Sequence, residues 1–179
     1  RVERDQVGRP ARRDRPAVVV GSEWLMRRRH DLPVAAFPAH EVRFPGDAAA
    51  RDAEGRRRAV LIGCLEGCHG PEGEGGVEAA AGIFSATAPT LPAVLPAYSD
   101  AELARLVRFG VRRDGRSAVG MPSGTFYPLS EEDLVLIFEH LRRRPSRPAV
   151  PRQRSVEPLG RLALVLGEWR LSADQVDRG

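Results

Sequence analysis

Two cysteines and a histidine lie close together in the segment "CLEGCHG", which begins at Cys64. The chain has no other cysteine, and His69 directly follows the second one, Cys68. Two thiols and an imidazole at this spacing could attach a haem covalently, bind a zinc ion or form a redox disulfide. The other residues of the chain have to distinguish these kinds of site.

Zinc and disulfide chemistry find little further support in the sequence. A zinc site needs additional nitrogen or sulfur ligands, but no second cysteine pair exists, and adjacent Cys68 and His69 rarely both turn toward one ion. A redox disulfide usually has two residues between its cysteines and lies near a βαβ unit. No βαβ unit is predicted, so both remain as less favoured alternatives.

Covalent haem attachment accounts for more of the sequence. The thiols would bond to the haem vinyl groups, and the histidine after the second thiol would lie under the iron. The usual motif has two residues between its cysteines, whereas Leu65, Glu66 and Gly67 lie between these two. The extra residue must form a bulge, which Gly67 makes feasible.

A methionine could supply the ligand on the other face of the iron. Met121 follows a loop and precedes a capped helix, and Pro122 stiffens the backbone beside it. A thioether is a soft ligand that favours reduced iron. The only other methionine, Met26, lies in the N-terminal arm.

A helix is predicted to bring the first cysteine to its C-terminus. Asp47 can cap this helix, which runs through Ala- and Arg-rich turns to a point at or near Gly63. Its inner face is predicted to contain Ala59, Val60 and Ile62.

Two further helices have clear start and stop signals. Ser99 and Glu102 form a capping box before a helix that ends at Gly110. Ser130 caps another helix, which Pro145 ends. The predicted apolar faces comprise Leu103, Leu106 and Val107 in the first, and Leu134, Ile137, Phe138 and Leu141 in the second.

The other segments read as irregular, so the predicted class is mainly α, with three core helices and long loops. Residues 1–46 form an extended arm, 47–146 a domain, and 147–179 a linker and C-terminal helix. Residues 70–97 are rich in Gly, Pro and Ala, which indicates a long loop around a cofactor. No convincing strand pair or internal repeat is present.

These residues together resemble class I cytochrome c, in its bacterial monohaem form. "GRRRAVLIGCLEGCHG" looks like the family's N-terminal helix and haem motif, and "GMPSGTFYPLSEEDLVLIFEHLRRRP" like its methionine loop and C-terminal helix. "APTLPAVLPAYSDAELARLVRFGVRRDGR" resembles its middle loop and helix. The likeness covers about residues 47–145. It implies the cytochrome c fold, built around one covalently bound haem c.

The resemblance also implies roles for single residues. Cys64 and Cys68 correspond to the thioether cysteines, His69 to the proximal iron ligand and Met121 to the distal one. Further correspondences place the Pro89 carbonyl on the proximal histidine ring, Gly55 at the crossing of the terminal helices, and Tyr127 beside the haem. His140 is expected at that helix interface, whereas His30 and His40 lie in the arm.

The expected function is one-electron transfer without enzymatic turnover, because a His/Met-ligated iron has no open site. The pocket is expected to include Ile62, Leu106, Phe126, Leu134 and Phe138. Expected partners are redox proteins or a membrane electron-transfer complex, on the periplasmic side or outer face of the cytoplasmic membrane. Residues 158–171 could contact a membrane surface or a partner subunit. Alternatives are an open-iron haem sensor and a structural subunit of a larger complex.

Charge does not point to nucleic acid. The net charge is +4 and every basic residue is arginine, but the arginine clusters 27–29, 56–58 and 142–144 stand beside acids or at helix ends. Aromatic residues are not interleaved with a basic stripe, so nucleic-acid binding is not expected.

Overall fold

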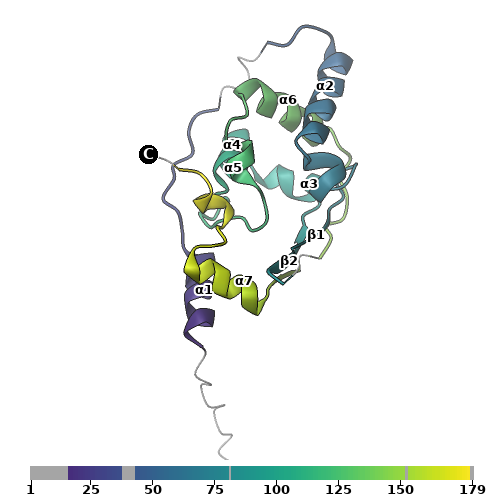
Figure 1. Cartoon of the computed structure of the whole chain (residues 1–179). Coiled ribbons are helices and arrows are strands. Elements are labelled where there is room, and N and C mark those ends of the chain that lie inside the picture. Colours follow the sequence, from purple (N-terminus) through teal and green to yellow (C-terminus); the bar gives the residue numbers. More distant parts are fainter. Residues whose placement is uncertain (1–15, 38–42, 81, 152, 178–179) are drawn as a thin grey trace, which may run out of the picture.

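Two crossing helices form the centre of the molecule. The computed structural model describes residues 16–37, 43–80, 82–151 and 153–177. In it, α2 (Ala48–Leu61) makes its most extensive contacts with α6 (Glu131–Arg142), and α4 (Asp100–Phe109) packs near them (Figure 1). The predicted mainly α class is confirmed.

The predicted helix boundaries are confirmed by their caps. The Asp47 carboxylate accepts a hydrogen bond from the Ala50 amide at 2.8 Å. Both capping boxes are present, Ser99 with Glu102 and Ser130 with Asp133. These side chains satisfy amide groups that a helix N-terminus leaves without partners, which explains why the helices begin where they do.

The crossing of α2 and α6 depends on a residue without a side chain. Gly55 is buried, and a Cβ atom there would overlap the Leu136 carbonyl and lie 2.9 Å from the His140 Cβ. Around the crossing, apolar side chains of α2, α4 and α6 join those of intervening segments in one core. Its buried members are Ala59, Leu65, Leu91, Leu95, Leu103, Ala104, Leu134, Ile137, Phe138 and Leu141.

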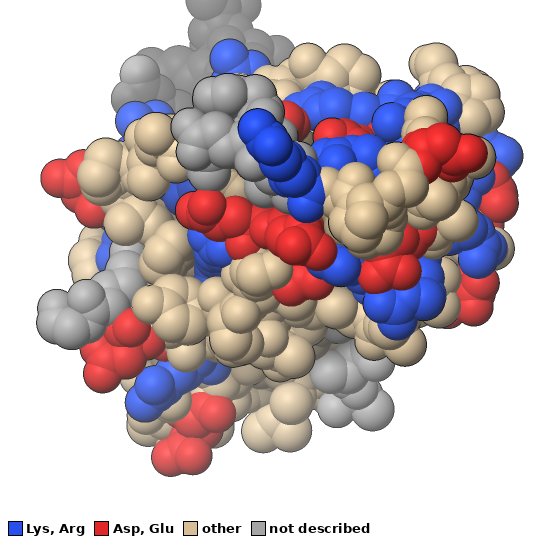
Figure 2. Space-filling view, turned by 90° about the horizontal axis from the view of Figure 1, so that it is seen from above, with Lys and Arg blue, Asp and Glu red and all other residues tan. Residues whose placement is uncertain are grey.

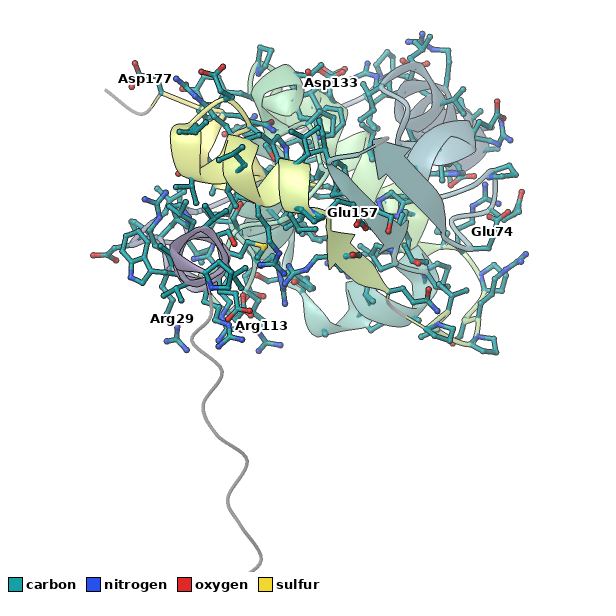
Figure 3. All side chains as sticks on the ribbon, turned by 60° about the horizontal axis from the view of Figure 1, so that its bottom comes forward. Arg29, Glu74, Arg113, Asp133, Glu157 and Asp177 are labelled. Carbon is teal, nitrogen blue, oxygen red and sulfur yellow. The ribbon has the colours of Figure 1, made fainter. Side chains whose placement is uncertain are left out.

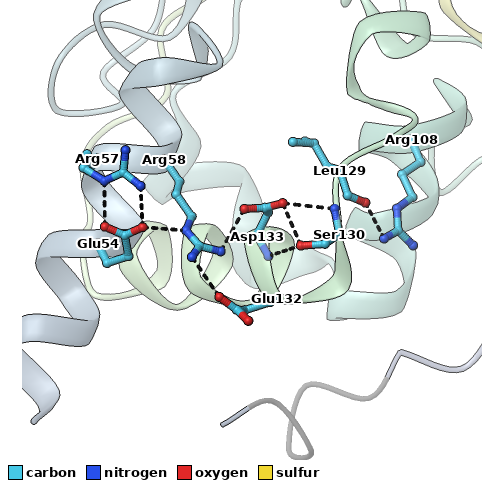
Figure 4. A network of polar contacts seen from close by, with 8 residues as sticks. All are labelled: Glu54, Arg57, Arg58, Arg108, Leu129, Ser130, Glu132 and Asp133. Atoms are coloured by element: carbon cyan, nitrogen blue, oxygen red, sulfur yellow. Dashed lines mark hydrogen bonds and ion pairs between the residues drawn. The ribbon is translucent and has the colours of Figure 1, made fainter. Parts of the chain in front are cut away.

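Ion pairs also connect α2 with α6. The Arg58 guanidinium bridges Glu54 on its own helix with Glu132 and Asp133 of α6, each at 2.8 Å (Figure 4). Because the Arg58 side chain is only 17% exposed, these contacts are better shielded from water than ordinary surface pairs. They connect the C-terminal half of α2 to the first turn of α6.

The expectation that the chain lacks a strand pair is wrong. Three strands form an antiparallel sheet in the order β1 (Gly76–Ala80), β2 (Phe84–Ala88) and β3 (Arg154–Val156). The strands are short and rich in Gly, Ala, Ser and Thr, so they lack the alternation of large apolar and polar residues that predicts strands. The predicted long loop therefore contains both β1 and β2.

The remainder of that predicted loop also has regular structure. It contains α3 (Leu91–Val94) and the 3₁₀ turn η2 (Leu95–Ala97). Leu91 and Leu95 belong to the central core, 8% and 4% exposed. The segment therefore contributes to packing as well as connecting elements.

The sequence predicted an extended N-terminal arm, but part of the arm is helical. Residues Ala17–Arg27 form the helix α1, which packs against α7 (Pro158–Leu166) (Figure 3). The sequence of α1 has little helix signal, because residues 18–20 are β-branched and no side chain caps its N-terminus; only Arg27 in the last turn fits a helix end. Together the two terminal segments and β2 build a second core, with Phe84 stacked on Trp169 at 5.1 Å; its buried members are Met26, Phe84, Val156, Leu164 and Leu171.

The surface charges are mixed on the face that Figure 2 shows. On the face shown in Figure 2, acidic and basic side chains lie next to one another rather than in separate areas. Within the described part of the chain, no helix is both long and apolar enough to cross a membrane.

Candidate haem-binding site

Cys64, Cys68 and His69 lie on a single turn, here called the Cys–His turn (residues 64–69). Helix α2 ends at Leu61, and Gly63 takes a left-handed conformation that redirects the chain. A π-type turn, η1 (Cys64–Cys68), follows directly, closed by a hydrogen bond from the His69 amide to the Cys64 carbonyl at 3.2 Å. The predicted delivery of Cys64 by this helix is confirmed.

The extra residue of the motif is accommodated at Glu66. Its φ of 62° makes it the one described non-glycine residue with a positive φ, a conformation that is uncommon for such a residue. The Glu66 carboxylate pairs with Arg56 of α2 at 3.3 Å, and Leu65 beside it is fully buried. Leu65, Glu66 and Gly67 all have non-helical backbone angles, so the bulge spans the three residues between the cysteines.

The His69 ring is held by the contact that the resemblance implies. Its Nδ1 lies 2.9 Å from the Pro89 carbonyl oxygen. Since a carbonyl only accepts hydrogen bonds, Nδ1 carries the proton and the lone pair of a neutral ring is on Nε2. Burial lowers the pKa of His69, and the bond to Pro89 opposes this only in part. A neutral imidazole with a free Nε2 lone pair is the form that binds a metal.

Burial also affects the first cysteine. It raises the pKa of the Cys64 thiol to about 12, and the neighbouring Cys68 adds to the effect. Cys64 packs at the edge of the central core. A metal-binding cysteine has to be a thiolate, so the surroundings of Cys64 favour a neutral sulfur such as a thioether.

The loop after His69 is fitted closely against the Cys–His turn. The Gly75 amide donates to the His69 carbonyl at 2.8 Å, and a Cβ at Gly76 would lie 2.7 Å from the Cys68 carbonyl oxygen. Thr90, 1% exposed, donates its hydroxyl hydrogen to the Glu74 carbonyl at 2.8 Å. This loop thereby fixes the distance between His69 and Pro89.

Met121 lies on a different segment, here called the Met121 loop (residues 111–122), between α4 and the short helix α5 (Ser123–Phe126). Its backbone carbonyl accepts hydrogen bonds from the Ser123 amide at 2.9 Å and the Ser172 hydroxyl at 2.6 Å. These contacts fix the Met121 backbone. A bond between its thioether and an iron stays a prediction.

The other residues expected near a haem are divided between core and surface. Phe126 is 9% exposed; Leu134 and Phe138 are also buried, and Ile62 and Leu106 are partly buried. Tyr127 is 47% exposed and packs edge-on against Phe109, with ring centroids 5.5 Å apart.

The two other described histidines, His30 and His140, make hydrogen bonds elsewhere in the molecule. His140 is 3% exposed and donates from Nδ1 to Asp52 of α2 at 3.2 Å, so it lies at the helix interface as expected. The His30 amide donates to the Gly115 carbonyl at 2.8 Å, which places its backbone beside the Met121 loop. His40 lies outside the described residues.

Two observations concern the zinc and disulfide interpretations of the Cys–His turn. Among the described side chains, His, Cys, Asp and Glu form no cluster of three or more that could hold a metal ion. The described sheet is antiparallel throughout, unlike the βαβ unit near which a redox disulfide is usual.

Two residues with clear structural roles were missed by sequence reasoning. Ser172 and Thr90 use their hydroxyl groups to connect segments 51 and 16 residues apart in the chain. A single buried serine or threonine has no sequence signal, because its partner is a distant backbone carbonyl.

Comparison of the chain with protein-family models, with curated proteins and with solved structures returned no match.

Proposed function

We propose that the protein is a one-electron carrier with a single haem c, bound covalently through Cys64 and Cys68 and ligated by His69 and Met121. The observation that supports this best is the hydrogen bond between His69 Nδ1 and the Pro89 carbonyl, at 2.9 Å. It selects the tautomer that a ligand needs, on the turn that also holds both cysteines.

Each residue of the site has a role that follows from its position. The haem, when bound, supplies the iron that gains and loses an electron. His69 presents Nε2, Pro89 fixes the ring orientation, and a thioether from Met121 would favour reduced iron. Buried apolar side chains of the central core limit access of water, which disfavours the more highly charged oxidised state.

Mass and spectrum test the proposal together. Protein purified from its native source should be heavier than the chain by one haem, and should keep that haem after denaturation. The reduced form should show sharp α and β bands, and the oxidised form a weak methionine–iron band at the red end. Protein without a Soret band would refute the proposal, and a high-spin oxidised spectrum would favour an open-iron sensor instead.

A second candidate is a haem-bearing subunit of a larger membrane complex. It is favoured by the exposed apolar side chains of α1 and α7, of which Trp24, Leu159 and Leu166 are 63%, 59% and 65% exposed. Such side chains on neighbouring helices are typical of surfaces that contact a partner or a membrane. We propose that the protein lies in the periplasm or at the outer face of the cytoplasmic membrane, on the side where thioether haem is assembled. Co-purification with a membrane fraction would favour the subunit.

A further inference from the structure

The end of the chain packs directly against the Met121 loop. After α7 the chain returns past α5 and forms the 3₁₀ turn η3 (Ser172–Asp174) beside it (Figure 1). Ser172 is fully buried, and its hydroxyl donates to the Met121 carbonyl at 2.6 Å. A serine from outside the predicted domain therefore touches the residue expected to bind the iron.

The surroundings of Ser172 leave it little freedom to move. The Ala173 amide donates to the Ser117 hydroxyl at 2.9 Å, and both residues are buried. Just before the Met121 loop, at the C-cap of α4, a Cβ on Gly110 would lie 2.5 Å from the Ser172 Cβ. The turn therefore fits into a space left by the missing side chain of Gly110.

The part of the chain from residue 150 to residue 177, here called the C-terminal segment, also contacts the side of the site that holds His69. Strand β3 pairs with β2, which ends at Ala88, next to Pro89. The Val150 amide donates to the Thr90 hydroxyl at 3.0 Å. Residues 150–175 thus contact the supports of both expected ligands.

We propose that the segment Leu171–Val176 positions Met121 for the iron, with Ser172 as the positioning residue. The inference rests on the proposed function, since it needs Met121 to be a ligand. The Ser172 hydroxyl donates to the Met121 carbonyl from a distant segment of the chain, and Ser172 is fully buried. The Met121 loop therefore cannot move away from the C-terminal turn without breaking this hydrogen bond. Loss of that bond should ease dissociation of the methionine.

Displacement of the methionine by added imidazole tests this on the full-length haem protein. Ser172→Ala removes the donor, while the Ser123 amide still satisfies the Met121 carbonyl. The apparent affinity for imidazole should rise about fivefold to tenfold, the factor expected when one buried hydrogen bond is lost. The methionine–iron band should weaken in parallel.

Two further variants separate positioning from general stability. Ser155→Ala changes an exposed serine of the same C-terminal segment, bonded to Glu157, and should leave imidazole affinity unchanged. If Ser172→Ala does not fold, Ser117→Ala loosens the same turn at Ala173 and should raise the affinity by a smaller factor.

The outcomes distinguish this inference from the proposed function. A methionine–iron band in the unmodified protein, with unchanged imidazole affinity in folded Ser172→Ala, would overturn the positioning role alone. Unchanged affinity in Ser117→Ala would overturn it where the first variant is unfolded. Absence of the band from the unmodified protein would refute methionine ligation, and the inference with it.

Discussion

The Cys–His turn and the Met121 loop are held in place in different ways. His69 bonds to a carbonyl 20 residues away within one continuous segment, and its turn follows directly from α2. The Met121 carbonyl is held by Ser172, 51 residues further along the chain. The direct bond to His69 thus lies within residues 64–89, although Val150 and β3 contact the neighbours of Pro89. The Met121 carbonyl has one local donor, the Ser123 amide, and one distant donor, Ser172.

The largest difference between the two regions is expected when each proposed iron ligand is removed. His69→Ala should abolish formation of the haem protein, because the turn would lose both its ligand and its bond to Pro89. Met121→Ala should keep a covalent haem on a folded chain, but with high-spin iron and a lower potential, since only the ligand is lost. Haem content, the oxidised spectrum and a redox titration measure these differences.

The alternative outcome would be equally informative. If Met121→Ala lost its haem as completely as His69→Ala, the two regions would be equally necessary for assembly. A Met121→Ala protein that stayed low-spin at high potential would show that another side chain is the distal ligand.

Alanine substitutions at two glycines should give a smaller difference, measured as a loss of stability. Gly55→Ala should lower the free energy of unfolding by about 3 kcal/mol, because its Cβ would overlap backbone of α6 where nothing can yield. Gly124→Ala, on α5, would place its Cβ 3.3 Å from the Gln175 Cβ of the C-terminal segment. At this exposed contact the cost should stay below about 1 kcal/mol.

Urea unfolding of both glycine variants, with haem content as a second readout, measures these costs. Equal losses at the two sites would mean that the Met121 side is packed as rigidly as the helix crossing.

Thr90 offers a smaller test where the C-terminal segment reaches the His69 side. Thr90→Val removes the hydroxyl that donates to the Glu74 carbonyl and accepts from the Val150 amide. The Glu74 carbonyl and the Val150 amide, both part-buried, would lose this partner. The free energy of unfolding should therefore fall by about 1–2 kcal/mol. The exposed Thr125→Val is the matched control. A Thr90→Val protein as stable as the control would show that neither the Glu74 contact nor the Val150 contact contributes to stability.

Sequence reasoning succeeded where the deciding signals are local. The caps at Asp47, Ser99 and Ser130, together with the stripe from Leu134 to Leu141, predicted the core helices and their boundaries. In these helices a few neighbouring residues determine the outcome. The close crossing at Gly55 was anticipated from the family resemblance, because its contacts on α6 are distant in the chain.

It failed where partners are distant or side chains are small. Strand β2 is paired on both edges, yet its partners are a glycine- and alanine-rich strand and a three-residue strand about 70 positions later. The sequence predicted a bulge between the cysteines, but gave no signal that Glu66 would be the residue with a positive φ. Ser172 had no signal at all.

The smallest expected effect concerns pH and belongs to the helix crossing. Burial lowers the pKa of His140, and its hydrogen bond to Asp52 opposes this only in part. Burial would raise the pKa of Asp52, but bonds from Arg143 and His140 outweigh it and lower that pKa. The native protein therefore binds fewer protons than the unfolded chain just below pH 6.5, the ordinary value for histidine.

Because the unfolded state binds more protons there, stability should decrease as the pH falls below 6.5 towards the lowered pKa of His140. His140→Gln keeps a hydrogen-bond donor for Asp52 but cannot titrate. The variant should therefore lose the part of the pH dependence that His140 contributes, whereas any part contributed by His69 stays the same in both proteins. Urea midpoints measured across that range for both proteins give the comparison. Parallel curves would show that His140 has the same pKa in the folded and unfolded chain, and that burial at the crossing does not control its charge.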